Sequence, residues 1–209
     1  MKTTKKVLVI VDIQNDFIPG GALPSLLGNQ TIPVANKLQP YFDLIVASVD
    51  WHPAHHGSFA SQYPCKKIGD VIDLHGIAQV LWPDHCVQNT HGAEFAPGLK
   101  TEKIVKLFHK GSDPTIDSYS AFFDNEHRRA TGLGDFLKEH HVTDVYLVGI
   151  ATDYCIKYSA IDAFHLGFNV FVIEDGCSGI NLKPNDSEEA LAEIEKLGVK
   201  IINSSDLVN

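Results

Sequence analysis

The sequence predicts a three-layer, doubly wound α/β fold, in which a mainly parallel six-stranded sheet carries helices on both faces. Six short apolar runs recur along the chain, and each run is continuous, as is typical of strands covered on both faces. Helix candidates lie between several of these runs, and this alternation favours a parallel sheet. The chain has 209 residues, of which 44% are hydrophobic. This length predicts a single domain over residues 1–209, because typical domains have about 100–200 residues.

The predicted strands are rich in β-branched residues. They are Val7–Val11, Leu44–Val49, Ile104–Phe108, Val145–Ile150, Val170–Ile173 and Val199–Ile202. The predicted helices are Gln30–Phe42, Glu126–His141, Asp153–Leu166 and Ser187–Leu197. Gly167 and Gly198 directly follow the last two helices, where a glycine commonly forms a C-cap. Asn185 and Asp186 precede the last helix and offer side chains that can cap its first N–H groups.

The segment from about 51 to 100 lacks this alternation and is rich in His, Pro, Gly and Asn. A loop region this long inside a compact domain is usually functional. More than half of the chain's 11 histidines fall within it, namely His52, His55, His56, His75, His85 and His91. Such a histidine cluster in an acidic protein favours a transition-metal site. We therefore expect this region to bind metal and substrate.

The charge and cysteine content limit the class of partner. The formal net charge of −9 argues against nucleic acid or an anionic membrane, since either would favour a Lys/Arg patch. A small-molecule substrate is expected instead. The apolar stretch Val7–Val11 is too short for a signal peptide or a membrane span. The four cysteines form no C-x-x-C pair and are expected to be reduced thiols in a cytoplasmic protein.

Polar residues follow four of the predicted strands. Asp12 follows the first strand, Asp50 and His52 the second, Lys110 the third, and Cys155 the fourth. Because ligands of open α/β sheets bind beyond the carboxyl ends of the strands, we expect these side chains to converge at one rim.

Cys155 is the candidate nucleophile. It is predicted to lie in the first turn of a helix, where exposed N–H groups and the helix dipole lower a thiol pKa, and an adjacent Lys110 would lower it further. Backbone N–H groups at Cys155 and near Ala151 could hold an oxyanion, and Asp12 could act as general acid and base. Each residue alone also fits a structural role: a buried cysteine, a turn-capping aspartate or a surface lysine. The functional interpretation depends on their convergence.

Asp50, His52 and His85 are the candidate metal ligands. Residues i and i+2 of an extended segment point the same way, so Asp50 and His52 can share one ion. One carboxylate and two imidazoles suit Zn, Fe or Mn and leave positions open for water and substrate. His56 and Ser58 are the candidates for a fourth contact, made directly or through water.

Five motifs along nearly the whole chain together resemble the nicotinamidases/pyrazinamidases, within the isochorismatase-like hydrolases. They are residues 11–17 (VDIQNDF) with 20–23 (GGAL), residues 50–59 (DWHPAHHGSF), residues 82–87 (WPDHCV), residues 110–111 (KG) and residues 149–155 (GIATDYC). The D-x-H and W-P-x-H-C motifs resemble those of the metal-dependent branch. Ser58 stands where some family members have a histidine ligand.

The resemblance implies a catalytic triad of Asp12, Lys110 and Cys155, and a zinc ion, or Fe or Mn, held by Asp50, His52 and His85. It also implies cysteine-dependent hydrolysis of nicotinamide to nicotinate and ammonia, as in NAD salvage, and activity on pyrazinamide.

The resemblance further implies a cis peptide bond before Ala151, which would turn N–H groups toward the oxyanion. Phe17 and Trp82 would sandwich the pyridine ring, and Tyr119 would close the pocket. Relatives often self-associate, so a homo-oligomer is an option. Two alternatives stay open: a metal-free relative that acts on another amide or on isochorismate, and a non-catalytic protein that binds a pyridine ligand or a partner protein.

Overall fold

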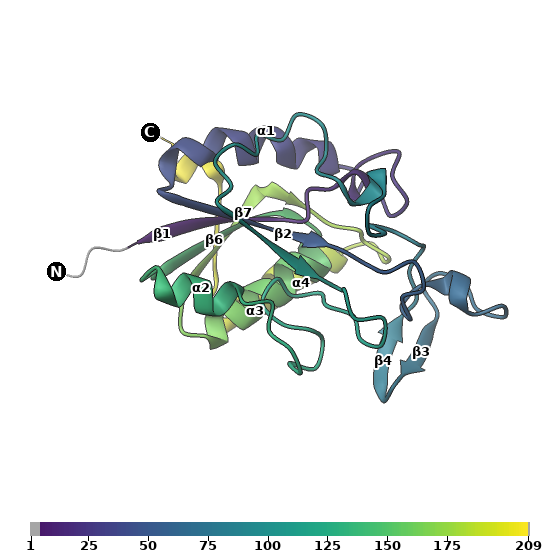
Figure 1. The fold of residues 1–209 in the computed structure, drawn as a ribbon. Coiled ribbons are helices and arrows are strands. Elements are labelled where there is room, and N and C mark those ends of the chain that lie inside the picture. Colours follow the sequence, from purple (N-terminus) through teal and green to yellow (C-terminus); the bar gives the residue numbers. More distant parts are fainter. Residues whose placement is uncertain (1–4, 209) are drawn as a thin grey trace.

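The computed structural model describes residues 5–208, in which a six-stranded parallel sheet forms the centre of the molecule (Figure 1). The strand order is β5-β2-β1-β6-β7-β8, and every neighbouring pair is parallel. The strands are β1 (Lys6–Val11), β2 (Leu44–Asp50), β5 (Lys106–Lys110), β6 (Asp144–Ile150), β7 (Asn169–Ser178) and β8 (Lys200–Ile202). The predicted fold class is confirmed, and the sheet is entirely rather than mainly parallel.

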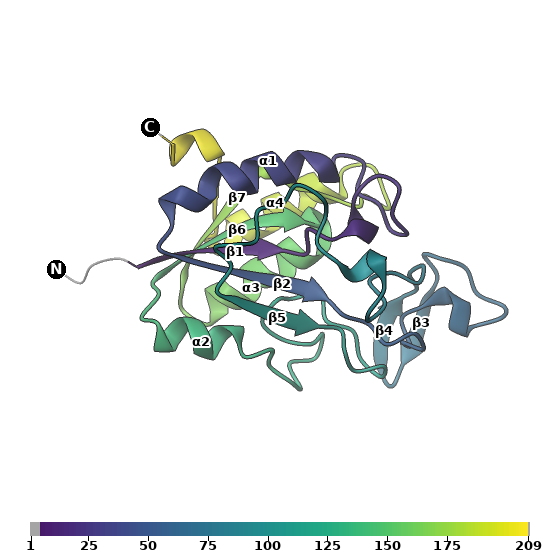
Figure 2. The same ribbon diagram turned by 45° about the horizontal axis from the view of Figure 1, so that its top comes forward.

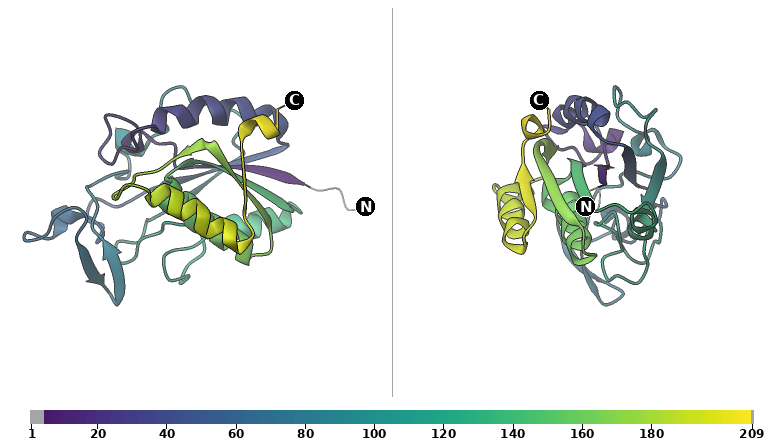
Figure 3. Two further views of the ribbon diagram at one scale, coloured as in Figure 1. Left: turned by 180° about the vertical axis from the view of Figure 1, so that it is seen from behind. Right: turned by 90° about the vertical axis from the view of Figure 1, so that its left-hand side faces the viewer.

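Helices cover both faces of the sheet (Figure 3). They are α1 (Gly28–Leu38), α2 (Leu133–Glu139), α3 (Lys157–His165) and α4 (Asp186–Leu197). Alternate residues of β1 face opposite layers: Val9 packs in the cluster that includes residues of α2, α3 and α4, whereas Leu8 packs in the cluster that includes residues of α1. This double burial explains the continuous apolar runs, since each buried aliphatic side chain contributes about 1.5–3 kcal/mol.

The predicted helix Glu126–His141 is wrong in its first half, because only Leu133–Glu139 is helical. Gly132 precedes the helix with φ +90°, a left-handed conformation that is outside any α-helix. Further upstream, the Asp124 carboxylate accepts the backbone N–H of Arg128 at 2.7 Å. Such a side-chain bond gives the backbone an alternative to helical pairing.

The first predicted helix, Gln30–Phe42, begins and ends earlier than expected. α1 ends at Leu38, and a 3₁₀ turn over Gln39–Tyr41 follows it. Pro40 lies within this turn, and its missing N–H and fixed φ favour a short turn over continued α-helix.

The segment 51–100 contains a β-hairpin that the sequence did not indicate. β3 (Val71–Leu74) pairs antiparallel with β4 (Ile77–Val80) through the turn His75-Gly76, and both turn residues have positive φ. Four-residue strands are too short for alternation to stand out from background. The hairpin projects from the end of the molecule, apart from the main sheet (Figure 1).

The carboxyl ends of β1, β2 and β5 all point toward this hairpin (Figure 2). β2 and β5 lie on one side of β1, and β6, β7 and β8 lie on the other side, so the direction of the strand order reverses at β1. The crevice at such a switch point is where ligands of doubly wound folds bind. Among residues 5–208, no helix is long and apolar enough to cross a membrane.

Candidate active site

Lys110 lies at the centre of the site and connects its acidic and thiol groups. It ends β5 directly beside Asp50, the last residue of β2, because the two residues are register partners. Its buried Nζ contacts Asp50 Oδ1, lies 2.9 Å from Asp12 Oδ2 and donates to Cys155 Sγ at 3.4 Å. The Ser118 carbonyl accepts a further hydrogen bond at 3.0 Å. The structure therefore brings together the three residues predicted for the triad.

Asp12 leaves β1 with φ +50° and turns its carboxylate into the protein interior. Its Oδ1 accepts a hydrogen bond from Ser48 Oγ at 2.7 Å, which fixes the carboxylate. Its Oδ2 pairs with Lys110 Nζ and has no further polar partner among residues 5–208. Carboxylate oxygens of Asp12 and Asp50 and the Cys155 sulfur lie within 4.8 Å of one another. Asp12 therefore has an oxygen available for a proton beside the thiol.

Cys155 does not lie in the first turn of an α-helix as predicted. It lies in a π-helical turn over Thr152–Ile156, and α3 begins only at Lys157. The expected low thiol pKa is also not found. Burial raises the pKa of Cys155 well above its usual range, and the Lys110 charge offsets only part of this. A raised pKa favours the protonated thiol, so the proposed attack calls for a base that takes the proton as the sulfur reacts.

The buried charges around the Cys155 thiol determine which neighbouring group can accept its proton. Burial raises the pKa of Asp12, although the Lys110 charge opposes the shift. Burial alone would lower the pKa of Lys110, but Asp12 and Asp50 outweigh it and raise that pKa well above its ordinary value. Lys110 therefore remains a cation, and Asp12 is the carboxylate with the greater proton affinity.

Asp50, His52 and His85 offer a nitrogen or oxygen each within 4.8 Å of one another, and all three are buried. Asp50 Oδ2 lies 3.7 Å from Nε2 of both His52 and His85. The other ring nitrogens bind backbone carbonyls: His52 Nδ1 lies 2.8 Å from the Gly111 oxygen, and His85 Nδ1 lies 2.7 Å from the Pro83 oxygen. A carbonyl accepts only, so each Nδ1 carries a proton and each Nε2 can bind metal.

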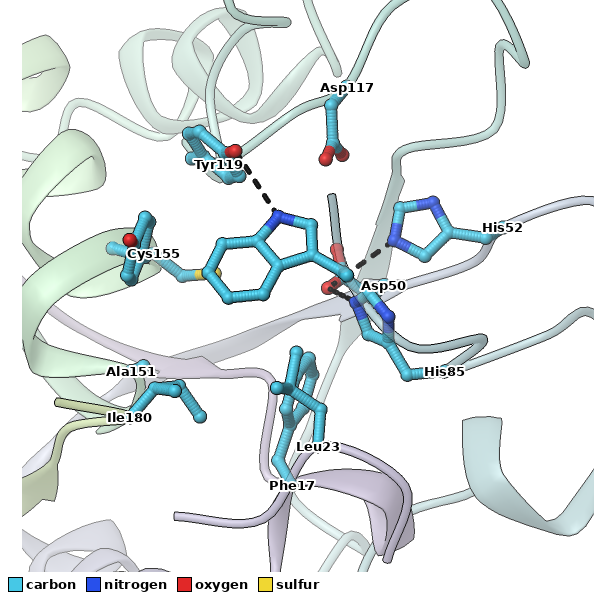
Figure 4. A pocket seen from close by; sticks show the side chains of 12 residues that line it. Phe17, Leu23, Asp50, His52, His85, Asp117, Tyr119, Ala151, Cys155 and Ile180 are labelled. Carbon is cyan, nitrogen blue, oxygen red and sulfur yellow. Dashed lines mark hydrogen bonds and ion pairs between the residues drawn. The ribbon is translucent and has the colours of Figure 1, made fainter. Parts of the chain in front are cut away.

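This arrangement fits a divalent transition metal. Lys110 occupies Oδ1 of Asp50 and leaves Oδ2 directed toward the two imidazoles (Figure 4). Burial alone would raise the pKa of Asp50, but the charges of Lys110 and His52 outweigh it and hold that pKa well below its usual range. One carboxylate oxygen with two imidazole nitrogens is a typical three-residue site for Zn, and Fe or Mn also accept these ligands.

Gln14 holds the main chain of Asp50 in place. Its Oε1 accepts the Asp50 N–H at 2.8 Å, and its Nε2 donates to the Asp50 carbonyl at 2.9 Å. A further bond from Nε2 to the Ala93 carbonyl at 2.9 Å connects this pair to the histidine-rich segment. The Gln of the opening motif thus positions a candidate metal ligand and does not line the cavity.

His56 and Ser58, the candidates for a fourth metal contact, bind each other. Ser58 Oγ lies 2.7 Å from His56 Nδ1. His56 Nε2 is buried and has no hydrogen-bond partner within residues 5–208. A ring nitrogen of His56 lies within 4.8 Å of ligand atoms of His52 and Asp117. His55, His75 and His91, in contrast, are exposed.

One cavity is lined both by the thiol and by the metal candidates. Its walls are Phe17, Leu23, Asp50, His52, Trp82, His85, Asp117, Tyr119, Ala151, Tyr154, Cys155 and Ile180. Phe17 and Leu23 lie on one side, and Tyr119 and Asp117 lie opposite (Figure 4). The aromatic residues implied by the resemblance all line it. The implied cis bond between Ile150 and Ala151 is confirmed.

Four wall residues were not singled out from the sequence: Leu23, Asp117, Tyr154 and Ile180. Leu23 and Tyr154 belong to the motifs at residues 20–23 and 149–155, so these motifs could have indicated both as cavity residues. Asp117 and Ile180 lie in irregular segments, where no periodicity indicates which way a side chain points.

Gly111→Ala is expected to lower metal affinity by about 10–100-fold, the range seen when a ligand's supporting contact is lost. Gly111 has φ +65°, and a Cβ there would lie 2.2 Å from His52 Cε1. The His52 ring would have to move from the position that its bond to the Gly111 carbonyl fixes. Metal content after dialysis against a graded chelator measures the effect.

Gly167→Ala is the matched control, because Gly167 also has positive φ (+90°) but a Cβ at this position would meet no atom within 4 Å. This variant should lose stability from backbone strain, about 1 kcal/mol, and retain its metal. Equal metal loss in both variants would show that strain, and not contact with His52, is responsible.

The chain is similar to known proteins along nearly its whole length. The isochorismatase domain family matches it over residues 6–206. The nicotinamidase of Escherichia coli is 46% identical over 205 residues, covering 96% of each chain. A nicotinamidase/pyrazinamidase structure from Acinetobacter baumanii is 43% identical with a TM-score of 0.94, covering 100% of both chains. The pyrazinamidase of Pyrococcus horikoshii, solved in complex with zinc, is 38% identical with a TM-score of 0.77, covering 95% of this chain and 99% of the other.

Proposed function

This chain belongs to the isochorismatase domain family, and we propose that it hydrolyses nicotinamide to nicotinate and ammonia through the thiol of Cys155. Its similarity to nicotinamidases over nearly its full length supports this reaction. Activity on pyrazinamide is expected as well, because one relative carries both activities in its name.

One observation supports the proposal above the others: Lys110 Nζ contacts Asp12, Asp50 and Cys155 at the wall of one cavity. A protein that only binds a pyridine ring has no use for a buried thiol beside a proton acceptor and a fixed cation. The site combines residues that follow β1, β2, β5 and β6 with residues of segment 51–100. That combination supports the proposal that residues 1–209 act as one domain.

The first half of the reaction transfers the acyl group to sulfur. As Sγ of Cys155 attacks the amide carbon, its proton passes to Asp12, and the C–S bond forms. Backbone N–H groups at Ala151 and Cys155, both at the cavity wall, are the proposed donors to the resulting oxyanion. Asp12 then returns the proton to nitrogen, the C–N bond breaks, and ammonia leaves a thioester.

The second half regenerates the enzyme. Water gives its proton to Asp12 and attacks the thioester carbon, the C–S bond breaks, and Asp12 returns the proton to sulfur. Lys110 stays protonated throughout, because the two carboxylates raise its pKa, and its charge stabilises the ionised thiolate and carboxylate states.

Asp50, His52 and His85 would hold one divalent metal, with Zn favoured because the zinc complex of a relative is known. When bound, such an ion is a Lewis acid that can take the pyridine nitrogen, directly or through water. The chain itself orients the ring: Phe17 and Trp82 are the proposed sandwich, and Tyr119 closes the wall between them and the thiol. A ring held at both ends places the amide beside the sulfur, which supplies much of the rate.

The metal-free alternative is disfavoured because both imidazoles are pre-oriented with Nε2 directed to Asp50. A cytoplasmic location and self-association are also proposed, and a measurement of the mass in solution tests the self-association.

Ammonia release from nicotinamide by the purified protein tests the function. We expect turnover by the metal-loaded protein, and loss of turnover or of substrate affinity after chelation, with recovery on adding Zn, Fe or Mn. No ammonia from the metal-loaded protein would refute the proposed activity. Unchanged kinetics in protein that elemental analysis shows to be metal-free would refute the role of Asp50, His52 and His85.

A further inference from the structure

The β3–β4 hairpin presents one polar side chain to the protein interior. Ile77, Gln79 and Leu81 alternate inward and are buried, whereas Ala78 between them is exposed. Gln79 is only 1% exposed, at a position where the alternation predicts an apolar residue. Burying an amide costs free energy unless it is hydrogen-bonded, so its partners indicate its role.

The Gln79 amide nitrogen lies within hydrogen-bonding distance of three acceptors. The Val80 carbonyl is at 2.7 Å, the Tyr119 hydroxyl at 3.0 Å and Asp117 Oδ2 at 3.2 Å. Asp117 and Tyr119 lie about forty residues further along the chain, and both line the substrate cavity. Gln79 itself does not line the cavity.

The network continues to the aromatic wall. Trp82 Nε1 donates to the same Tyr119 hydroxyl at 3.3 Å, and the two rings pack edge to face. The segment that carries Asp117 and Tyr119 runs from β5 to α2, and residues 111–132 of it form neither helix nor strand. Asn125 holds the main chain here, since its N–H donates to the Asp117 carbonyl at 2.9 Å and its Oδ1 accepts the Tyr119 N–H at 3.0 Å. The outer ends of the Asp117 and Tyr119 side chains lie beyond these bonds, and Gln79 contacts them there.

We propose that Gln79 is a positioning residue that joins the β3–β4 hairpin to the substrate cavity by holding Asp117 and Tyr119 against Trp82. The hairpin thereby sets the width of the cavity between Tyr119 and the opposite wall at Phe17 (Figure 4). Gln79 acts through its partners and takes no part in the chemistry at Cys155. The kinetic part of this proposal rests on the proposed function.

Gln79→Met keeps the length and bulk of the side chain and removes the donor. We expect KM for nicotinamide to rise about tenfold, the size of one lost hydrogen bond to a charged group, with kcat within about threefold of wild type. The preference for nicotinamide over ring-methylated nicotinamides should fall by about fivefold or more, because a looser wall admits a larger ring. Gln79→Glu should be worse, since a second carboxylate would face Asp117.

Leu74→Ala is the matched control, because Leu74 is buried in the same hairpin but its side chain makes none of the hydrogen bonds of this network. It should lower the Tm through a cavity and leave KM and ring selectivity unchanged. If Gln79→Met lowers the Tm with no change in KM or selectivity, as this control does, the residue is merely structural and the proposal is overturned.

A fluorescence measurement decides the question without turnover. The chain has two tryptophans, Trp51 and Trp82, so a Trp51→Phe background reports on Trp82 alone. Adding Gln79→Met should shift Trp82 emission to longer wavelength and increase quenching by acrylamide, because Tyr119 no longer holds the indole N–H. Unchanged emission and quenching would overturn the proposed role of Gln79. This test does not depend on turnover, whereas a lack of ammonia release by the wild-type protein would refute only the proposed function.

Discussion

Replacing Cys155 with alanine is expected to lower ammonia release from nicotinamide by at least about 10⁴-fold while leaving metal content unchanged. Loss of a covalent nucleophile removes the reaction path rather than one favourable contact, and nucleophile variants of comparable enzymes fall by this much or more. The Cys155 sulfur lies at the cavity wall beside Lys110 and is not one of the three proposed ligands. Elemental analysis and steady-state ammonia release on the same preparation measure both quantities.

Cys177→Ala is the matched control for this variant. Cys177 is also a free thiol, but it lies in β7 and packs against the core away from the cavity. Burial raises its pKa to about 12, as burial also raises that of Cys155, but Cys177 does not line the cavity that holds the proposed triad. Cys177→Ala should keep wild-type turnover. Appreciable residual turnover in Cys155→Ala, beyond a few parts in ten thousand, would exclude covalent catalysis through Cys155.

Lys110→Met is expected to destabilise the fold by about 3–5 kcal/mol and to reduce turnover severely. The change removes the cation between two buried carboxylates and leaves Asp12 and Asp50 without their ion pair. Breaking a buried pair from one side costs this much because the remaining charge is uncompensated. Chemical denaturation gives the free energy of unfolding, and ammonia release gives the turnover.

The loss of unfolding free energy in Lys110→Met should become smaller as the pH falls. Lys110 opposes the burial that raises the pKa of Asp12, so its removal should raise that pKa further. A carboxyl whose folded-state pKa is raised destabilises the fold fully above that pKa, and the penalty disappears as the pH falls to its ordinary value of 3.8. The deficit should therefore be largest at neutral pH and shrink as the pH falls. In wild type, the stabilisation from Lys110 is present below the ordinary lysine pKa of 10.5 and is lost only as the pH rises through the higher folded-state value.

Lys106→Met serves as the control, because Lys106 lies in the same strand but is exposed. It contacts the rings of Phe108 and Phe136, an interaction worth about 0.5–1 kcal/mol at an exposed site. A deficit for Lys110→Met no larger than this, or one that does not shrink in acid, would contradict the buried ion-pair account.

Local pattern was enough to predict the fold and the residues at the strand ends. The runs at Val7–Val11 and Leu44–Val49 are apolar at nearly every position because both faces of the sheet are covered, and that burial is visible in the sequence. Once the strands are parallel, their carboxyl ends must share an edge, so Asp12, Asp50 and Cys155 were expected together before any contact was known.

The sequence failed where a side-chain hydrogen bond, a very short strand or a contact between distant segments decides the structure. The helix predicted from Glu126 was wrong because a bond from the Asp124 carboxylate to the Arg128 N–H competes with helical pairing. The hairpin Val71–Val80 was missed because two four-residue strands carry too little periodicity. Gln79 gave no signal, since its partners lie about forty residues away.

The sequence by itself determined the parallel sheet and the identity of the groups that meet at its edge, because the pattern of apolar residues records which faces are buried. Only the tertiary structure decided the direction in which the pKa values of those groups shift. Cys155 was expected to be a thiolate from its place near a helix start, yet burial raises its pKa instead. Desolvation and the charge of Lys110 depend on every atom that surrounds the sulfur, and no local pattern along the chain encodes that environment.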